Sequence, residues 1–294
     1  MHASRDLASA LEPVVGSVYF SPECHALYAG LGFAPSAREV NGVAMPDGPA
    51  YFTSRGSLMG QVPGEVVAAA FAVFSPAAVV PSVSFGWTLT DAVTICAARR
   101  DGAVAQLQRI LGERPEGVAR AREILTRAIA PLRPEGRPLF AGTLAQTMPD
   151  DDLAAVWHMG DMLREFRGDS HTAAWIAAGL DATEIGLLSE LYWGLPMRSY
   201  SRTRAWTEAE FDAAHERLQQ RGLVDATGFT SAGHTVREQI ELHTDQQLDP
   251  VVASLGDDLA ELVAVLTPWG AAVRAAHGYP ASGPHDLAAA AKKP

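Results

Sequence analysis

Cysteine is scarce in this 294-residue chain, which contains only Cys24 and Cys96. Two cysteines cannot form the dense disulfide framework of a small secreted domain, and a chain of this length that is 48% hydrophobic can bury a core of its own. The first residues, MHASRDLASALEP, also lack the basic start and the apolar stretch of a secretory signal peptide. We therefore expect reduced thiols and a soluble, intracellular protein with a cytoplasmic location.

Long uninterrupted apolar runs are absent as well. The most apolar stretch, Val66–Trp87, contains Pro76 and Pro81, so each uninterrupted piece falls short of the ~20 residues that a membrane-spanning helix needs. We expect this stretch to lie in the protein core, and we predict no membrane contact.

Positive charge is in deficit, because 23 Lys and Arg residues face 34 Asp and Glu residues, which gives a formal net charge of −11. An average field of that sign repels a phosphate backbone, although a local basic patch can override it. Nucleic acid is therefore not an expected partner.

Helix signals, in contrast, are abundant. Ser21 followed by Pro22 is a typical helix start, and Thr207 with Glu210 has the spacing of a capping box. Gly168 is expected to break a helix that begins near Leu153, with Asp169 or Ser170 capping the next helix. These signals predict a mainly α fold.

The two halves of the chain are related by one shift of 119 positions without a gap. The identical pairs are Gly60 with Gly179, Glu65 with Glu184, Trp87 with Trp206 and Thr88 with Thr207. Internal similarity of this kind indicates repeated structural units. We predict an N-terminal repeat at 1–135, a C-terminal repeat at 136–278 and a disordered tail at 279–294.

The second repeat contains the most specific local pattern, WTEAEFDAAHERLQQRGLVDATGFTSAGHTVREQIELHTD, which reads as helix, tight hairpin and helix. In layout, residues 182–248 resemble the end of a winged-helix domain of the multiple-antibiotic-resistance regulator (MarR) type. That resemblance implies a transcription regulator that places a recognition helix in the major groove. The helix in that position is acidic instead, with Glu208, Glu210, Asp212 and Glu216 against Arg217 and Arg221, and it follows a segment with Arg198, Arg202 and Arg204.

Motifs over about Leu7–Trp269 resemble an actinobacterial family that includes SalK-like proteins encoded near polyketide antibiotic genes. They are YFSPE, YFTSRGSLMG, GRPLFAGTLA, VWHMGDMLREFRGDSH, LQQRGLVD and REQIELHTD. The resemblance implies a fold of two winged-helix-like helical repeats with one or two short β-hairpins as wings. It also implies a link to natural-product metabolism or resistance, without a particular activity.

The stretch LREFRGDSHTAAW, from Leu163 to Trp175, concentrates charge within apolar helix. One interpretation is a capped helix junction, in which buried charges pair with one another. The other is a catalytic site in which His158, Asp169 and His171 transfer protons while Arg164 or Arg167 holds a carboxylate or phosphate. A metal would require His158, Asp161 and His171 to converge, and their spacing matches no metal motif, so we predict no metal and no cofactor.

Aromatic residues occupy equivalent or neighbouring places in the two repeats: Phe71, Phe74, Trp87, Tyr192, Trp193 and Trp206. They are either ordinary core or the wall of an apolar pocket between the repeats, with Tyr200, Arg202 or His215 as polar anchors. Our leading hypothesis is a protein that binds an apolar or aromatic small molecule in that pocket, with Arg164 and Arg167 also contacting it. The alternatives are a natural-product tailoring enzyme and a MarR-like transcription regulator, and the sequence leaves a homodimer open.

Overall fold

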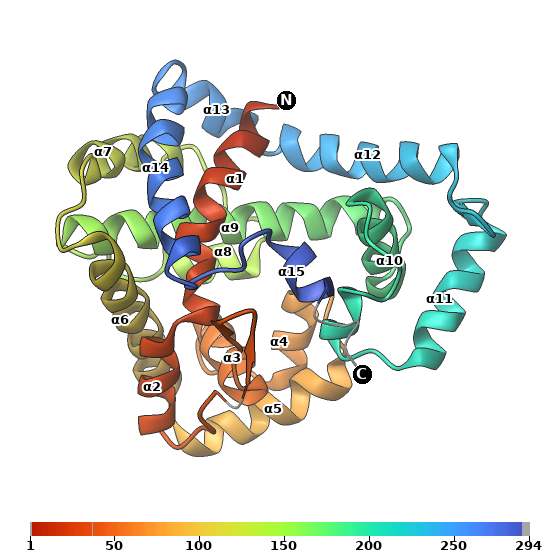
Figure 1. Ribbon diagram of the computed structural model, residues 1–294, viewed down its shortest axis with the longest axis horizontal. Coiled ribbons are helices and arrows are strands. Elements are labelled where there is room, and N and C mark those ends of the chain that lie inside the picture. Colours follow the sequence, from red (N-terminus) through yellow and green to blue (C-terminus); the bar gives the residue numbers. More distant parts are fainter. Residues whose placement is uncertain (1, 37, 290–294) are drawn as a thin grey trace.

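The computed structural model describes residues 2–36 and 38–289, and this part of the chain is mainly helical (Figure 1). The α-helices are α1 (Ala3–Val15), α2 (Pro22–Gly30), α3 (Gly48–Gly56), α4 (Gly64–Phe71), α5 (Pro76–Leu89), α6 (Ala92–Leu111), α7 (Val118–Ile129), α8 (Pro138–Leu144), α9 (Asp152–Ala177), α10 (Ala182–Tyr192), α11 (Glu208–Gln220), α12 (Ser231–Gln246), α13 (Asp249–Leu255), α14 (Asp258–Ala275) and α15 (Pro284–Ala289). Short 3₁₀ turns are η1 (Gly16–Phe20), η2 (Ser57–Met59) and η3 (Ser201–Arg204).

Two small antiparallel hairpins complete the described structure. Strand β1 (Glu39–Val40) pairs with β2 (Val43–Ala44), and β3 (Val224–Asp225) pairs with β4 (Gly228–Phe229). The predicted fold class, mainly α with one or two short hairpins, is confirmed.

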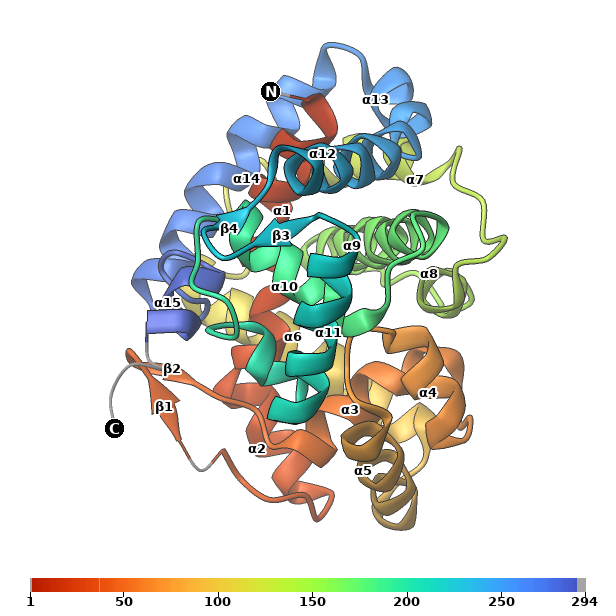
Figure 2. The same ribbon diagram turned by 90° about the vertical axis from the view of Figure 1, so that its right-hand side faces the viewer.

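Helix α9 runs through the middle of the molecule, where α1, α7, α8 and α12 pack against it and α14 packs on α1 (Figure 1). Figure 2 shows α10, α11, the β3–β4 hairpin and α12 gathered on one side. None of the helices in the described ranges is by itself long and apolar enough to cross a membrane; α5 and α6 meet the length and composition together, with a bend of 97° between them.

The predicted helix break at Gly168 is wrong, because α9 continues without interruption from Asp152 to Ala177. A glycine inside a helix costs ~1 kcal/mol relative to alanine, which is a weak signal beside the burial of apolar side chains on both sides of it. Trp157 and Phe166 before the glycine and Trp175 after it are all buried.

The largest apolar cluster draws residues from both sides of the predicted boundary at residue 135. It joins Leu7, Val14 and Leu125 to Trp157 and Leu262. A second cluster lies around α10 and α11, and a third lies between α3, α4 and α5. The division of the chain into two repeats stays a prediction, and the core of the first repeat is shared with α9 and α14.

The order of elements differs between the two halves. The β1–β2 hairpin precedes α3, whereas β3–β4 lies between α11 and α12. The aligned indoles of Trp87 and Trp206 both donate to a backbone carbonyl, at 2.8 Å to Val62 and 2.9 Å to Val73. Trp87, however, lies inside α5, whereas Trp206 precedes the N-cap of α11.

Local signals in the winged-helix-like segment act as predicted. Thr207 caps α11 in a capping box with Glu210, and Thr230 caps α12 by accepting from Gly233 N. The hairpin turns between Asp225 and Gly228. These caps satisfy N–H groups that a helix start leaves without a partner.

The predicted tail at 279–294 stays a prediction. Tyr279 is buried and donates a hydrogen bond to Glu12 at 3.0 Å, and Pro284–Ala289 form α15. The phenol of Tyr279 packs on Phe20 beside the end of α1. Residues 290–294 lie outside the described residues.

Candidate functional site

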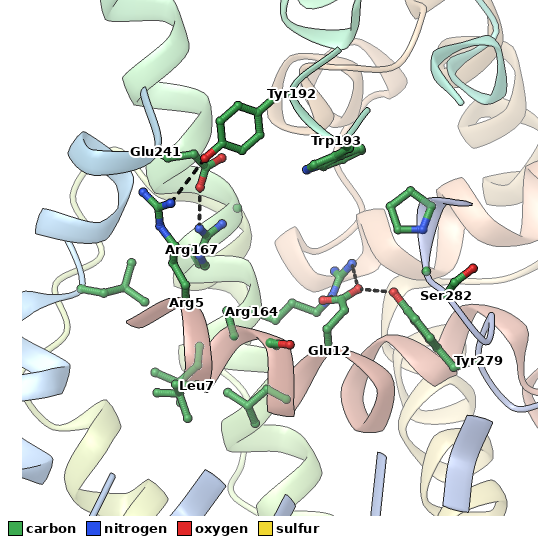
Figure 3. Close-up of a pocket in the computed structure, with 18 of the residues that line it drawn as sticks. Arg5, Leu7, Glu12, Arg164, Arg167, Tyr192, Trp193, Glu241, Tyr279 and Ser282 are labelled. Carbon is green, nitrogen blue, oxygen red and sulfur yellow. Dashed lines mark hydrogen bonds and ion pairs between the residues drawn. The ribbon is translucent and has the colours of Figure 1, made fainter. Parts of the chain in front are cut away.

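Two adjoining cavities open where the N-terminal helices meet α9 and α10. The first, of about 600 Å³, lies between α1, α9, the end of α10 and the C-terminal segment 279–284 (Figure 3). The second, of about 320 Å³, lies between α4, α9, α10, η3 and α12. Six residues line both cavities and therefore form the partition between them: Arg55, Arg164, Arg167, Gly168, Trp193 and Glu241.

Four of the predicted aromatic residues line the second cavity: Phe71, Trp193, Tyr200 and Trp206. Phe71 belongs to α4, and the other three lie between the end of α10 and the start of α11, so both halves of the chain contribute. The rings of Trp193 and Tyr200 meet edge to face, with centroids 5.8 Å apart. The hydrogen bond from Trp206 to Val73 ties this segment to the end of α4.

The segment that carries Tyr200 and η3 is fixed by the buried side chain of Glu190. One carboxylate oxygen accepts the backbone N–H groups of Tyr200 and Ser201 at 2.6 and 2.5 Å, and the other accepts that of Arg198 at 2.6 Å. Hydrogen bonds to a charged acceptor are stronger than neutral ones. The irregular wall of the cavity is therefore held by α10 rather than left as a free loop.

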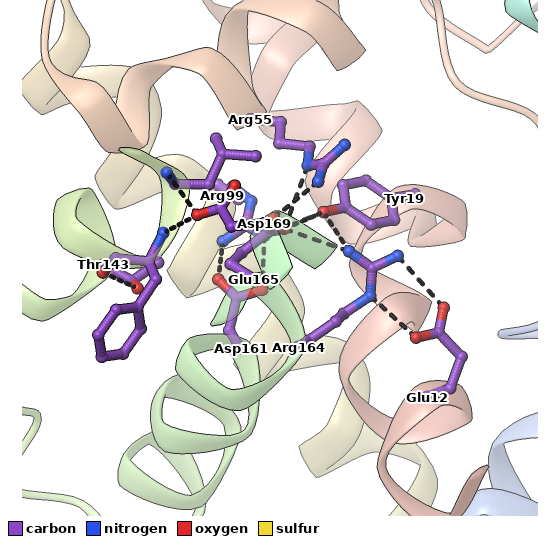
Figure 4. Close-up of polar contacts among 11 residues, drawn as sticks. Glu12, Tyr19, Arg55, Arg99, Thr143, Asp161, Arg164, Glu165 and Asp169 are labelled. Carbon is purple, nitrogen blue, oxygen red and sulfur yellow. Dashed lines mark hydrogen bonds and ion pairs between the residues drawn. The ribbon is translucent and has the colours of Figure 1, made fainter. Parts of the chain in front are cut away.

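Two arginines of the partition, Arg55 and Arg164, are held by Glu165, which is completely buried (Figure 4). Arg55 donates to both carboxylate oxygens at 3.1 and 2.6 Å, and Arg164 donates to one of them at 3.2 Å. Arg164 also donates to Tyr19 Oη and to Glu12. Burial alone would raise the pKa of Glu165, but Arg55 and Arg164 outweigh it and hold the pKa at about 2. The carboxylate is therefore ionised at neutral pH, and both guanidinium groups are fixed in place.

The third arginine of the partition, Arg167, shares the carboxylate of Glu241 with Arg237. Arg167 Nη2 donates to one oxygen of Glu241 at 2.9 Å, and Arg237 Nη2 binds the other at 2.7 Å. Burial works against ionisation of Glu241, but Arg237, His171 and Arg167 lower its pKa to about 2. One negative charge thus faces two guanidinium groups at the cavity wall.

His171 lines the second cavity as a neutral imidazole. Its Nδ1 lies 3.1 Å from Thr244 Oγ1, whose own proton is donated to Ile240 O at 2.7 Å. Nδ1 must therefore carry the imidazole proton, which leaves Nε2 as an acceptor. Burial, and then the charge of Arg237, lower the pKa of His171 to about 4.

Asp169 does cap a helix, but not the one that was predicted. Its carboxylate accepts the N–H groups of Leu139 and Phe140, both at 3.0 Å, which are in the first turn of α8. Burial raises the pKa of Asp169 to about 6, in spite of these two bonds. Asp169 therefore joins α8 to α9 and does not orient a histidine.

The hypothetical acid–base set is not brought together. His158 and His171 lie 13 positions apart on one helix, which places them ~20 Å apart along its axis. His158 is buried without a partner for Nε2 among the described residues, and burial lowers its pKa. Asp169 binds the first turn of α8, whereas His171 contacts Thr244 on α12, so the two side chains are engaged with different helices.

Several predicted ligand contacts lie outside the second cavity: Phe74, Trp87, Tyr192, Arg202 and His215. Phe74 packs in the aromatic cluster of the third core, and Tyr192 lines the first cavity, where its hydroxyl donates to Glu238 at 2.5 Å. Arg202 is exposed and donates Nε to Ser199 O at 2.9 Å. Trp87 belongs to the contact between α5 and the core, and His215 lies on α11.

Among the residues of the second cavity that were not predicted are Arg55, Trp175, Arg204, Arg237 and Glu241. One signal could have found Trp175. Arg164, Gly168, His171 and Trp175 follow the spacing of one helical face, and all line the cavity. The predicted break at Gly168 concealed that periodicity.

The helix that corresponds to a recognition helix, α11, presents paired charges. Arg198 binds Glu208 at 2.9 Å and Asp212 at 2.6 Å. Arg217 binds Asp181 and Glu184 at 2.5 and 3.1 Å. Arg198 and Arg217 are thus already neutralised by carboxylates.

The helix–hairpin–helix arrangement of α11, β3–β4 and α12 within a mainly α chain defines a winged-helix-like protein. The chain belongs to a helix-turn-helix family, whose family model matches residues 4–280. No curated protein and no solved structure matched the chain in the searches that we made.

Proposed function

We propose that the protein binds an apolar or aromatic small molecule in the second cavity. The observation that carries this proposal is the lining of the second cavity. Aromatic side chains from both halves of the chain line it together with arginines: Phe71, Trp193, Tyr200 and Trp206 with Arg55, Arg164, Arg167, Arg204 and Arg237. A mostly apolar cavity with a few placed polar groups is the usual form of a small-molecule site, and about 320 Å³ lies at the lower end of the usual sizes. The SalK-like motifs extend the proposal to a ligand from natural-product metabolism or resistance.

Isothermal titration against a panel of planar aromatic metabolites, including indoles, flavonoids and anthraquinones, tests the proposal. Trp206→Ala should weaken any binding at least tenfold, because it removes one wall of the cavity. Trp87→Ala is the matched control, since it also removes a half-buried indole with a hydrogen bond to a backbone carbonyl, but outside the cavity. Equal effects of the two substitutions, or no binding of any compound, would contradict the proposal.

DNA reading through α11 is not part of this proposal, because Arg198 beside the helix and Arg217 on it are paired with carboxylates. Fluorescence anisotropy with a labelled duplex at low ionic strength should show no saturable binding. Saturable binding that is lost in Arg217→Gln would instead favour the transcription regulator, the function most often associated with helix-turn-helix folds.

A further inference from the structure

The second cavity is rich in cations whose carboxylate partners are already engaged. Of the two carboxylates that line it, Asp169 accepts backbone N–H groups of α8, and Glu241 is shared by Arg167 and Arg237. Neither is left to neutralise Arg204, which also lines the cavity. The charge of Arg204 therefore has no counterpart on the cavity wall.

Within residues 2–36 and 38–289, no carboxylate lies at ion-pair distance from Arg204. Its guanidinium makes one side-chain hydrogen bond, from Nη2 to Tyr200 Oη at 2.6 Å. The rings of Phe74 and Tyr200 flank it, with centroids 4.5 and 4.8 Å from Cζ. A guanidinium held by two rings is preorganised to bind a carboxylate through two parallel N–H groups, because little side-chain freedom remains to be lost on binding.

A second observation, independent of charge, concerns unpaired polar atoms. Four buried atoms of cavity-lining residues lack a hydrogen-bond partner in the described part of the chain: Arg167 Nε, Trp175 Nε1, Ser201 Oγ and Arg237 Nη1. Each of the four can donate, and three can only donate. A buried donor left unpaired costs ~1–3 kcal/mol, so the residues of this wall carry more donors than the described part of the chain supplies with acceptors.

We propose that the ligand of the second cavity is an organic acid, with a flat apolar body against Phe71 and Trp206 and a carboxylate bound by Arg204. This inference rests on the proposed small-molecule function and adds the chemical class of the ligand. The apolar rings supply affinity that does not depend on charge, and Arg204 supplies the preference for the acid.

The test compares each of three aromatic acids with its own primary amide: benzoate with benzamide, 2-naphthoate with 2-naphthamide, and anthracene-2-carboxylate with its amide. Each amide matches its acid in shape, but it lacks the negative charge and carries an NH2 donor in place of one acceptor oxygen. Quenching of tryptophan fluorescence, confirmed by isothermal titration, should give at least tenfold tighter binding of the acid within the pair that fits. In Arg204→Gln this preference should fall below threefold, with the affinity for the amide changed less than threefold.

Arg202→Gln is the matched control, because it removes an exposed arginine two positions away that does not line the cavity, and it should keep the full preference. Arg204→Lys should keep part of the preference for the acid, since the positive charge remains but the planar pair of N–H donors is lost. Equal binding of acid and amide to the wild type would overturn this inference and leave the proposed function standing. Absence of binding by all six compounds would count against both.

Discussion

Replacement of Glu165 by glutamine tests the charged network that holds the partition between the two cavities. Glutamine keeps the size and one acceptor but removes the negative charge that faces Arg55 and Arg164. The ordinary pKa of this carboxyl is 4.5, and in the folded protein it is about 2. At 1.36 kcal/mol per unit, this difference of about 2.5 units corresponds to ~3 kcal/mol of stability at pH 7. That agrees with the ~3–5 kcal/mol lost when one partner of a buried ion pair is removed.

The pH dependence gives the prediction its sharper form. Because the pKa of Glu165 is lowered on folding, its contribution is fully present above pH 4.5 and is lost as the pH falls towards about 2. The difference in unfolding free energy between wild type and Glu165→Gln should therefore fall from ~3 kcal/mol at pH 7 to ~1 kcal/mol at pH 3. Groups that titrate equally in both proteins cancel in this difference.

Urea unfolding, followed by tryptophan fluorescence at pH 7, 5, 4 and 3, measures the difference directly. Glu208→Gln is the control, because the side chain of Glu208 is 75% exposed in its pair with Arg198, and such pairs contribute less than about 1 kcal/mol. A difference for Glu165→Gln that does not change with pH, or that equals the control, would refute the reasoning.

Three further predictions concern single positions. Thr207→Ala removes the cap of α11 and should lower the unfolding free energy by ~1 kcal/mol in urea melts, whereas Thr207→Ser should restore it. Gly142→Ala places a Cβ 2.1 Å from Leu58 O and should lower the melting temperature sharply, whereas Gly30→Ala meets no atom within 4 Å and should leave it nearly unchanged. The unfolding free energy of the wild type should fall by ~2 kcal/mol between pH 7.5 and pH 5, because the unfolded imidazole of His171 takes up a proton near pH 6.5 and the folded one only near pH 4. His171→Gln should not show this fall. An equal pH profile in the variant would exclude His171 as the cause.

The parts of the fold that depend on short-range signals could be predicted from the sequence. The capping box at Thr207 and Glu210 and the cap of α12 at Thr230 are local hydrogen bonds between residues three apart. The hairpin turn near Gly228 is equally local. Such features need no knowledge of what packs on them, so the sequence pattern is sufficient.

The cavity itself was predictable only in part. Its aromatic wall was found through the alignment of the two halves, because Phe71, Trp193 and Trp206 lie near equivalent positions. Its cations were not predicted, since Arg55 and Arg237 reach the cavity from α3 and α12, and only tertiary packing, of α3 on α5 and α6 and of α12 on α9, brings them together. Arg202 was predicted as a ligand contact instead of Arg204, because an irregular segment has no sequence periodicity from which the direction of a side chain can be inferred.

The arrangement of charge predicts how an acid would reach the cavity. The chain has a net charge of −11, whereas the side chains that line the second cavity include Arg55, Arg164, Arg204 and Arg237. An organic anion is therefore repelled at long range and attracted only at the cavity, in contrast to ligands steered in by an opposite field. Salt screens the long-range repulsion over a Debye length of ~10 Å at 0.1 M and affects the buried contacts much less.

Stopped-flow fluorescence with the tightest-binding acid should thus show an association rate constant that rises between 10 mM and 0.3 M salt, while the rate constant for its amide stays constant. A fall in the association rate constant of the acid with rising salt would contradict this reasoning. It would mean that the charge at the cavity entrance, and not the net charge of the protein, controls association.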